Sequence, residues 1–290
     1  MNNLKIIKLL KTKKINNNNI LTDKILNNNK SSELDNNITN NKLDFAYKIN
    51  FISFGNNIYY NSLNRIENEA IKFNLFNDII IVREQNIKND DLYKEFWLKH
   101  KNFIESNRRG YGYWIWKSYI ILKQLEKMNE NDVLIYADAG CQLNINGIDR
   151  LLNYIDIVQK SNYGILTFQM SHSEKTWTKM DTITFILNDD NKFTEIINSG
   201  QIIATTMIIK KCEHSIKLIK KWYDTLNNYH LLDDSNSIQS NDNTFREHRH
   251  DQSIFSLLIK KYGGEIISDE TWYTNWNDGN KIPILAKRYK

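Results

Sequence analysis

Cysteine is scarce in this sequence, and its scarcity narrows the classes to which the protein can belong. Cys141 and Cys212 are the two cysteines among 290 residues, and they form no spaced cluster. This count argues against a disulfide framework and against a cysteine-rich zinc site. Two free thiols also favour a reducing compartment over an oxidising one.

Long apolar runs and blocks of like charge are missing as well. No stretch reaches the roughly 20 apolar residues of a membrane span. The apolar segment 4–10 is interrupted by lysines and has no small-residue cleavage site after it. We therefore expect no transmembrane segment and a cytoplasmic protein. The net charge of +5 is mild and is compatible with an anionic ligand such as a nucleotide diphosphate, but it gives no reason to expect nucleic acid as a partner.

The composition divides the chain into two parts. Residues 1–45 contain asparagine runs among lysine and isoleucine, which predicts a low-complexity, flexible leader. The remainder, 46–290, shows no internal repeat and no second change of composition. It therefore predicts a single folded domain.

Strands and helices alternate along the predicted domain. Apolar runs predict strands at 49–55, 78–82, 132–137, 163–170, 201–209 and 265–267. Helical patterns lie at 62–73, 90–106, 114–128, 148–160, 212–227 and 251–262. This alternation predicts an α/β fold with a mostly parallel central sheet flanked by helices on both faces. Ligands of such sheets bind at the carboxyl ends of strands, so the residues after each strand are the candidates for function.

The strand at 132–137 leads directly into Asp138, Ala139 and Gly140. A carboxylate at the end of a buried strand needs a hydroxyl, a backbone N–H group or a metal ion as a partner. The two small residues after it let a ligand approach the backbone closely. Mn²⁺ or Mg²⁺ held by Asp138 and by phosphate oxygens is one interpretation. A turn or helix cap made by Asp138 is the alternative, and this feature alone does not separate the two.

An aromatic and basic segment, 108–117, precedes that strand. Its Tyr111 and Trp114 offer rings for stacking on a sugar or base, and Arg109 and Lys117 offer cations for phosphate oxygens. Its two glycines permit a tight turn before the helix. The alternative is a helix that packs through its aromatic residues while its cations reach solvent.

These motifs, in this order, resemble a group of GT-A-type glycosyltransferase-like proteins found in giant viruses, microbes and some algae. The resemblance is carried by Gly-Tyr-Gly-Tyr-Trp-x-Trp-Lys at 110–117, Asp-Ala-Gly-Cys at 138–141 and Glu-His-Arg-His-Asp-Gln-Ser at 247–253. It implies a GT-A (Rossmann-like) nucleotide-diphospho-sugar transferase fold, a nucleotide-sugar donor, and a divalent metal. Asp138 takes the place of the first Asp of the Asp-x-Asp signature of such enzymes, and Gly140 stands where the second would be. A viral source would place the protein in the host cytoplasm.

The residue pattern and the resemblance together predict a donor site and a catalytic pair. The donor-binding residues are Phe54, Gly55, Arg109, Tyr111, Trp114, Lys117, Asp138, Ala139, Gly140 and Gln252. Among them, Phe54 and Gly55 are expected against the base and Lys117 beside the diphosphate. Asp138 and Asp251 are the catalytic residues, with Asp251 as the base if the enzyme inverts the anomeric centre. Asp138 and His250 are the expected ligands of Mn²⁺ or Mg²⁺.

The acceptor side is expected to use Trp177, Lys179, Asp181, Gln201 and His250. A surface loop with one buried tryptophan is the alternative for the first three of these. The acidic and histidine residues at 247–251 also invite comparison with a zinc hydrolase. Because His248 and His250 are two positions apart, they would not share a helix face, which argues against that comparison.

The sequence thus predicts a glycosyltransferase that moves a sugar from a nucleotide-diphosphate sugar, UDP-linked in the first instance, to an acceptor hydroxyl. The acceptor would be a glycan, a glycoprotein or a lipid-linked sugar. The alternative is a catalytically inactive protein of the same fold that binds nucleotide sugars or carbohydrates. The missing second Asp favours the alternative, whereas the intact Asp138, Lys117 and His250-Asp251-Gln252 favour the enzyme.

Overall fold

The computed structural model describes residues 45–188 and 190–289. The predicted leader, 1–45, lies outside these residues except for its last position. Tyr47–Lys290 forms one compact unit. Among the described residues, no helix combines the length and the apolar character needed to span a membrane.

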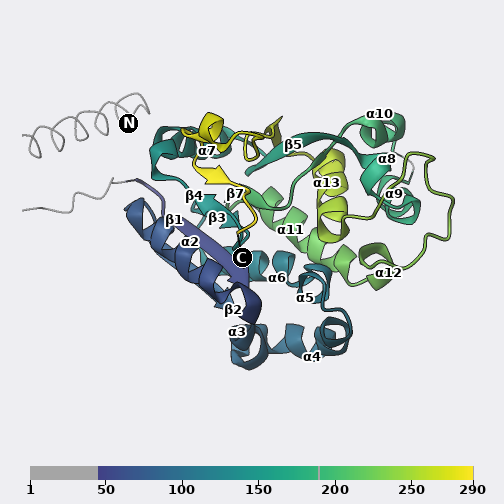
Figure 1. The fold of residues 1–290 in the computed structure, drawn as a ribbon, viewed down its shortest axis with the longest axis horizontal. Coiled ribbons are helices and arrows are strands. Elements are labelled where there is room, and N and C mark those ends of the chain that lie inside the picture. The colour runs from purple at the N-terminus through teal and green to yellow at the C-terminus, as the bar shows by residue number, and fades with distance from the viewer. Residues whose placement is uncertain (1–44, 189, 290) are drawn as a thin grey trace, which may run out of the picture. The chain divides into compact units, whose positions relative to one another are not determined.

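A seven-stranded mixed sheet runs through the unit (Figure 1). Its order is β2-β1-β3-β7-β5-β6, and β8 pairs with β5 outside this path. The strands are β1 (Ile49–Gly55), β2 (Asp78–Arg83), β3 (Val133–Ala137), β5 (Ile165–Ser173), β6 (Gly200–Ile202), β7 (Thr206–Lys210) and β8 (Glu265–Ser268). Strand β1 runs parallel to β2 and β3, and β8 runs parallel to β5. Strand β7 is antiparallel to both β3 and β5, and β6 is antiparallel to β5.

Helices cover both faces of this sheet, which confirms the predicted α/β class. They are α2 (Tyr60–Lys72), α3 (Glu84–Asn89), α4 (Asp91–Ser106), α5 (Gly110–Tyr113), α6 (Trp116–Lys127), α7 (Ile148–Lys160), α8 (Glu174–Trp177), α9 (Met180–Leu187), α10 (Phe193–Asn198), α11 (Glu213–Leu226), α12 (Tyr229–Leu232) and α13 (His250–Tyr262). Helix α2 packs on β1 and β2, and α7 packs on β5 and β7. The opposite face carries α6, α11 and α13, whose apolar residues share one core cluster with β1, β3 and β7.

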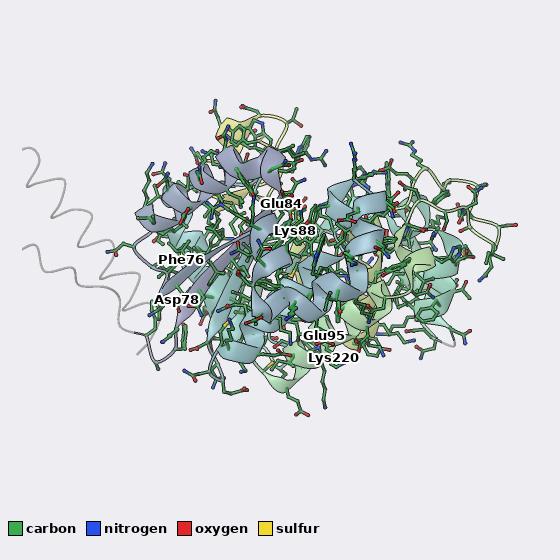
Figure 2. The ribbon with its side chains drawn as sticks, turned by 90° about the horizontal axis from the view of Figure 1, so that it is seen from below. Phe76, Asp78, Glu84, Lys88, Glu95 and Lys220 are labelled. Carbon is green, nitrogen blue, oxygen red and sulfur yellow. The ribbon has the colours of Figure 1, made fainter. Side chains whose placement is uncertain are left out.

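The central strands are apolar for a physical reason that the sequence already contains. Every residue of β1 and of β3 is buried, because helices cover both faces of the sheet at this point. Helix α4 packs beside α11 through Phe96 and Tyr223, whose ring centroids are 6.3 Å apart. Figure 2 labels Glu95 of α4 and Lys220 of α11 on this side of the molecule.

Most predicted boundaries differ from the observed ones by one to three residues, and β1 and α7 have the predicted bounds. The single strand predicted at 201–209 is wrong. It is divided into β6 and β7 by the segment 203–205, which leaves the ladder. In that segment the N–H of Ala204 donates to Gln252 Oε1 at 3.2 Å, and not to a carbonyl oxygen of a neighbouring strand. A side chain far away in the sequence therefore decides where this strand breaks.

A separate two-stranded sheet pairs the C-terminal segment with the residues that follow β3. Strand β4 (Gln142–Leu143) pairs antiparallel with β9 (Ile284–Leu285). Since β4 begins just after the turn that follows β3, this pairing holds the segment at 284–285 close to the carboxyl end of β3.

Candidate functional site

Three charged side chains meet at the carboxyl end of β3. The Lys117 Nζ atom lies 3.3 Å from Asp138 Oδ1 and 3.0 Å from Asp251 Oδ2. It also donates a hydrogen bond of 3.1 Å to the carbonyl oxygen of Ala204. The Tyr136 hydroxyl donates to the same Asp138 oxygen. We call Lys117, Asp138 and Asp251 the charged triad.

Exposure differs within the charged triad. The side chain of Asp138 is 29% exposed, whereas those of Lys117 and Asp251 are 3% and 4% exposed. Asp138 is therefore the member that a ligand can touch. Because the ammonium of Lys117 already faces three oxygen atoms, it has no proton left for a phosphate. The prediction that Lys117 binds the diphosphate does not fit this geometry.

Burial and ion pairing act in opposite directions on these groups. Burial by itself lowers the pKa of Lys117, but the charges of Asp138 and Asp251 outweigh it, and the net pKa is raised. Burial raises the pKa of Asp251 to about 6, against the lowering effect of Lys117. Burial, together with the charge of Asp138, raises the pKa of Tyr136 well above its usual value, so its hydroxyl remains a donor.

Lys117 reaches the triad because the chain makes a left-handed turn just before α6. The residues at 110–114 all have positive φ, between 52° and 83°. Left-handed backbone costs roughly 1–2 kcal/mol for each residue that is not glycine, so packing must hold the three aromatic residues of this turn in place. Gly112 is required, because a Cβ there would lie 2.7 Å from a side-chain carbon of Ile104. The two glycines thus produce the tight turn that the sequence suggested.

Asp251 is placed by the first turn of α13. Its backbone oxygen accepts a hydrogen bond of 3.1 Å from the indole of Trp222, which is fully buried on α11. The side chain of Asp251 contacts Lys117 and is 4% exposed, and this burial argues against direct contact with an acceptor. The position of Asp251 therefore does not fit the predicted role as the base. It fits an ion-pair partner that holds Lys117 in place.

Gln252, which is partly exposed, and Gln201, which is buried, form an amide pair beside the triad. Gln252 Nε2 donates to Gln201 Oε1 at 2.6 Å, and Gln252 Oε1 accepts from the N–H of Ala204. Gln201 is fully buried and its amide nitrogen also donates to Thr178 and Ser253, at 3.1 and 3.2 Å. The predictions that Gln252 contacts the donor and Gln201 the acceptor are thus replaced by a structural role. The pair fixes the break between β6 and β7, which presents the Ala204 carbonyl to Lys117.

The C-terminal segment covers the turn after Asp138. The N–H of Tyr289 donates to the Gly140 oxygen at 2.9 Å, and the Ser62 hydroxyl donates to the Tyr289 oxygen at 3.2 Å. A Cβ on Gly140 would lie 3.2 Å from the Arg288 Cα atom. The small size of Gly140 therefore accommodates the chain's own tail, where the sequence predicted a ligand.

Three further predicted donor contacts are filled by protein packing. Phe54 is 4% exposed, and its ring centroid lies 3.9 Å from that of Trp116. A Cβ on Gly55 would lie 2.9 Å from the nearest side-chain carbon. Ala139 is buried, and its oxygen accepts from Arg65 at 2.8 Å. The prediction of a base-binding surface at Phe54 and Gly55 is corrected: these residues belong to the core.

The aromatic and basic segment before α6 divides between two neighbourhoods. Arg109 pairs with Asp234 at 3.3 Å and with Glu247 at 3.7 Å, so it faces the loop before α13. Tyr111 packs against the buried end of β1, and its hydroxyl is buried with no partner among the described residues. Trp114 is half-buried, and its ring centroid lies 5.6 Å from that of His250. The segment thus supports the triad by packing, and Lys117 alone of its predicted donor residues enters the triad.

Lys179 and Asp181, predicted in the acceptor pocket, anchor the long loop at 233–249. Lys179 Nζ donates to the oxygens of Asp233 and Ser235, both at 3.2 Å. Asp181 accepts from two backbone N–H groups of the same loop, at 2.7 and 2.9 Å. Both side chains are buried, so their role is to fix the loop that carries the residues before α13. Trp177, the remaining member of the predicted set, is half-buried and has one ring face covered by Arg249 at 3.9 Å.

His250 is not brought together with Asp138. Its Nδ1 atom hydrogen-bonds the Leu232 oxygen at 2.8 Å, and its ring stacks on Tyr113 with centroids 4.6 Å apart. Burial lowers the pKa of His250, which favours the neutral ring. Its Nε2 atom faces Asp234 at 3.6 Å rather than the triad. The predicted acceptor and metal roles of His250 are therefore not supported by its position.

The donor set at Asp138 does not fit a divalent cation. Within residues 45–188 and 190–289, no group of three or more histidine, cysteine, aspartate or glutamate side chains is arranged to hold a metal ion. The two carboxylates that do converge have the Lys117 ammonium between them, and a dication placed there would be repelled by it. The residues around Asp138 therefore do not fit the Mn²⁺ or Mg²⁺ site that was expected at Asp138 and His250.

Sequence reasoning missed Tyr136, the Ala204 carbonyl and Arg249 as parts of this region. Tyr136 could have been found, because residues two apart on a strand point to the same face, and Asp138 follows it by two. The Ala204 carbonyl could not, since its place depends on a break in a strand.

A separate cavity of about 380 Å³ lies between α9, α11 and α13, and none of its lining residues belongs to the charged triad.

Comparisons with known proteins give a likeness of fold at low identity. No family model matches the chain, and no curated protein matches it by sequence. A glycosyltransferase involved in the glycosylation of the major capsid of PBCV-1 is 12% identical, with 82% of this chain and 91% of that chain covered and a TM-score of 0.41. Mouse xyloside xylosyltransferase 1 is 15% identical, with 80% and 89% covered and a TM-score of 0.41. Galactosyltransferase LgtC, with donor and acceptor sugar analogs, is 10% identical, with 81% and 86% covered and a TM-score of 0.38.

Proposed function

We propose that this protein is a glycosyltransferase that moves a sugar from a nucleoside-diphosphate sugar, UDP-linked in the first instance, to an acceptor hydroxyl. The acceptor is a hydroxyl of a glycan, a glycoprotein or a lipid-linked sugar. The observation that carries the proposal is the exposed carboxylate of Asp138, held at the carboxyl end of central strand β3 by a buried lysine. This is the edge at which α/β sheets bind ligands. The resemblance of the motifs at 110–117, 138–141 and 247–253 to GT-A-type transferases supports the same function.

Each member of the triad has a proposed task. The Asp138 carboxylate accepts a hydrogen bond from a hydroxyl of the donor, because it is the exposed member. Lys117 and Tyr136 fix the orientation of that carboxylate. Asp251 holds Lys117 in place from below. A carboxylate fixed in this way positions the donor without the cost of ordering it during the reaction.

The proposed reaction breaks the bond between the anomeric carbon and the diphosphate oxygen. The electron pair of that bond leaves on the diphosphate. The acceptor oxygen forms a bond to the anomeric carbon, and its proton passes to the leaving diphosphate. Neither an oxidant nor a reductant is needed, and the products are a nucleoside diphosphate and the glycosylated acceptor.

Turnover of a panel of nucleotide sugars tests the proposal. The full chain is incubated with UDP-, GDP- and ADP-linked sugars and with simple glycosides as acceptors, and the release of the nucleoside diphosphate is measured. We expect release with at least one donor and loss of release in Asp138→Ala, with circular dichroism to show that this variant is folded. Binding of a nucleotide sugar without turnover on any acceptor would instead favour the inactive binding protein.

A further inference from the structure

Arg249 precedes the first turn of α13 and forms no ion pair with the part of the chain that the structure describes. Its guanidinium carbon lies 3.9 Å from the ring centroid of Trp177. Its Nε atom is buried and forms no hydrogen bond with the described part of the chain. Of the acids nearby, Glu247 is half exposed and already lies 3.7 Å from Arg109. A stacked guanidinium keeps its N–H edge free, so Arg249 is prepared to bind an anion.

The backbone around Arg249 is fixed. Its N–H donates to the Trp177 oxygen at 3.1 Å and also lies within hydrogen-bonding distance of the Ser253 hydroxyl, at 3.1 Å. Arg249 is the residue before the first turn of α13, and the N-terminus of a helix adds a partial positive charge. Asp251 of the charged triad follows it by two positions. The backbone that carries this cation is therefore fixed by hydrogen bonds, two residues before a member of the charged triad.

A second arginine approaches from the C-terminal segment. Arg288 is exposed, and its backbone is seated on Gly140, at the turn that follows Asp138. No ion pair involves it among residues 45–188 and 190–289. The positive charge of Arg288 acts on Arg249, whose pKa is lowered mainly by burial and further by that charge. Two cations that repel one another are stabilised when an anion binds between them.

The charged triad makes such a pair of cations necessary for a diphosphate. With both carboxylates ionised, Lys117 leaves the triad with a net negative charge, and all of its own donors are directed at protein oxygens. A diphosphate beside Asp138 would therefore need positive charge from elsewhere. The divalent cation that is expected for this purpose has no suitable donor set among the described residues.

We infer that Arg249 and Arg288 bind the diphosphate of the donor and that this binding requires no divalent cation. The inference rests on the proposed function for the identity of the ligand. Arginine forks form two parallel hydrogen bonds with phosphate oxygens, which suits a diphosphate held between two guanidinium groups. The departing nucleoside diphosphate is then neutralised by the chain itself.

Titration calorimetry of the full chain with UDP and with inorganic pyrophosphate tests this inference. Each ligand is titrated once in EDTA and once in MnCl₂. We expect the wild type to bind UDP with affinities that agree within about twofold in the two buffers. Since a hydrogen bond to a charged group is strong, Arg249→Met and Arg288→Met should each weaken binding by about tenfold to a hundredfold. Arg249→Lys, which keeps the charge but loses the fork, should recover part of that loss.

Arg246→Met is the matched control. Arg246 is an exposed arginine whose guanidinium carbon also lies near the Trp177 ring, at 5.9 Å, but it is not placed at the triad. This variant should bind both ligands as the wild type does. Circular dichroism and thermal unfolding of every variant exclude loss of fold as the cause of weaker binding.

The outcomes for the inference and for the proposed function are distinct. Binding of both ligands that disappears in EDTA, or unchanged binding by Arg249→Met, overturns the inference even if the enzyme transfers sugar. Pyrophosphate binding in EDTA that depends on Arg249 and Arg288 supports the anion site even if no nucleotide sugar is turned over. In that second case the proposed function fails and the anion site remains.

Discussion

The buried carboxylate of Asp251 predicts an unusual dependence of stability on pH. Burial raises its pKa in the folded state from 3.8 to about 6. A carboxyl group with a raised pKa contributes stability that is complete below its unfolded value and is lost as the pH rises through the folded value. The shift corresponds to about 3 kcal/mol, since each pKa unit corresponds to about 1.4 kcal/mol. The wild type should therefore gain stability from this group as the pH falls from 7 towards 4.

Asp251→Asn removes the ionisable group while keeping the shape of the side chain. Urea unfolding at several values between pH 4 and pH 7 gives the free energy of unfolding of each protein. As the pH is lowered over that range, the free energy of unfolding of the wild type should rise by about 2–3 kcal/mol relative to that of the variant. Identical pH profiles for the two proteins would refute the assignment of the raised pKa to Asp251.

Asp181 provides a control of opposite sign in the same chain. Burial acts to raise its pKa, but hydrogen bonds from two backbone N–H groups and from His230 outweigh burial, and the net pKa is lowered. Its contribution to stability is present above the unfolded pKa and is lost as the pH falls through the folded value. The difference in the free energy of unfolding between wild type and Asp181→Asn should therefore become smaller as the pH falls. The corresponding difference for Asp251→Asn should become larger.

Three further predictions concern single side chains. Lys117→Met leaves Asp251 buried beside a second carboxylate with no cation, so the free energy of unfolding at pH 7 should fall by about 3–5 kcal/mol, and restoration by adding Asp251→Asn would identify the unpaired charge as the cause. Asp138→Ala should abolish turnover with little change in the thermal midpoint, and near-normal turnover would contradict its role. Gly200→Ala should cost about 1–3 kcal/mol or more in urea unfolding, because its Cβ would lie 1.7 Å from the Met170 oxygen; wild-type stability would show that the two strands can separate at no cost.

Local sequence pattern was sufficient for the frame of the fold. Strands β1 and β3 are continuous apolar runs, and the amphipathic pattern of Ile148–Lys160 gave both ends of α7. The position of Asp138 at the end of such a strand could be read from the sequence. Lys117 was singled out as a cation of the segment 108–117, but its contact with Asp138 and Asp251 was not predicted. The strands, the helix and the position of Asp138 depend on neighbours in the sequence, which is why they could be predicted.

Features that depend on distant contacts could not be predicted in the same way. Gln201 was predicted on the acceptor side, but its amide pairs with Gln252, which lies some fifty residues further along the chain. Gly140 looked like room for a ligand, but the C-terminal tail fills that room. His250 looked like a metal ligand beside Asp251, but its φ of 52° turns it toward Tyr113. Each correction comes from packing between segments that the sequence pattern does not connect.

A crystal structure of the full chain with the nucleoside diphosphate released in the turnover assay tests the central claim most directly. The account predicts the nucleotide at the carboxyl end of β3, with a hydroxyl on the Asp138 carboxylate and the diphosphate between Arg249 and Arg288. A nucleotide bound instead in the cavity between α9, α11 and α13, with the Asp138 carboxylate free of ligand, would contradict it.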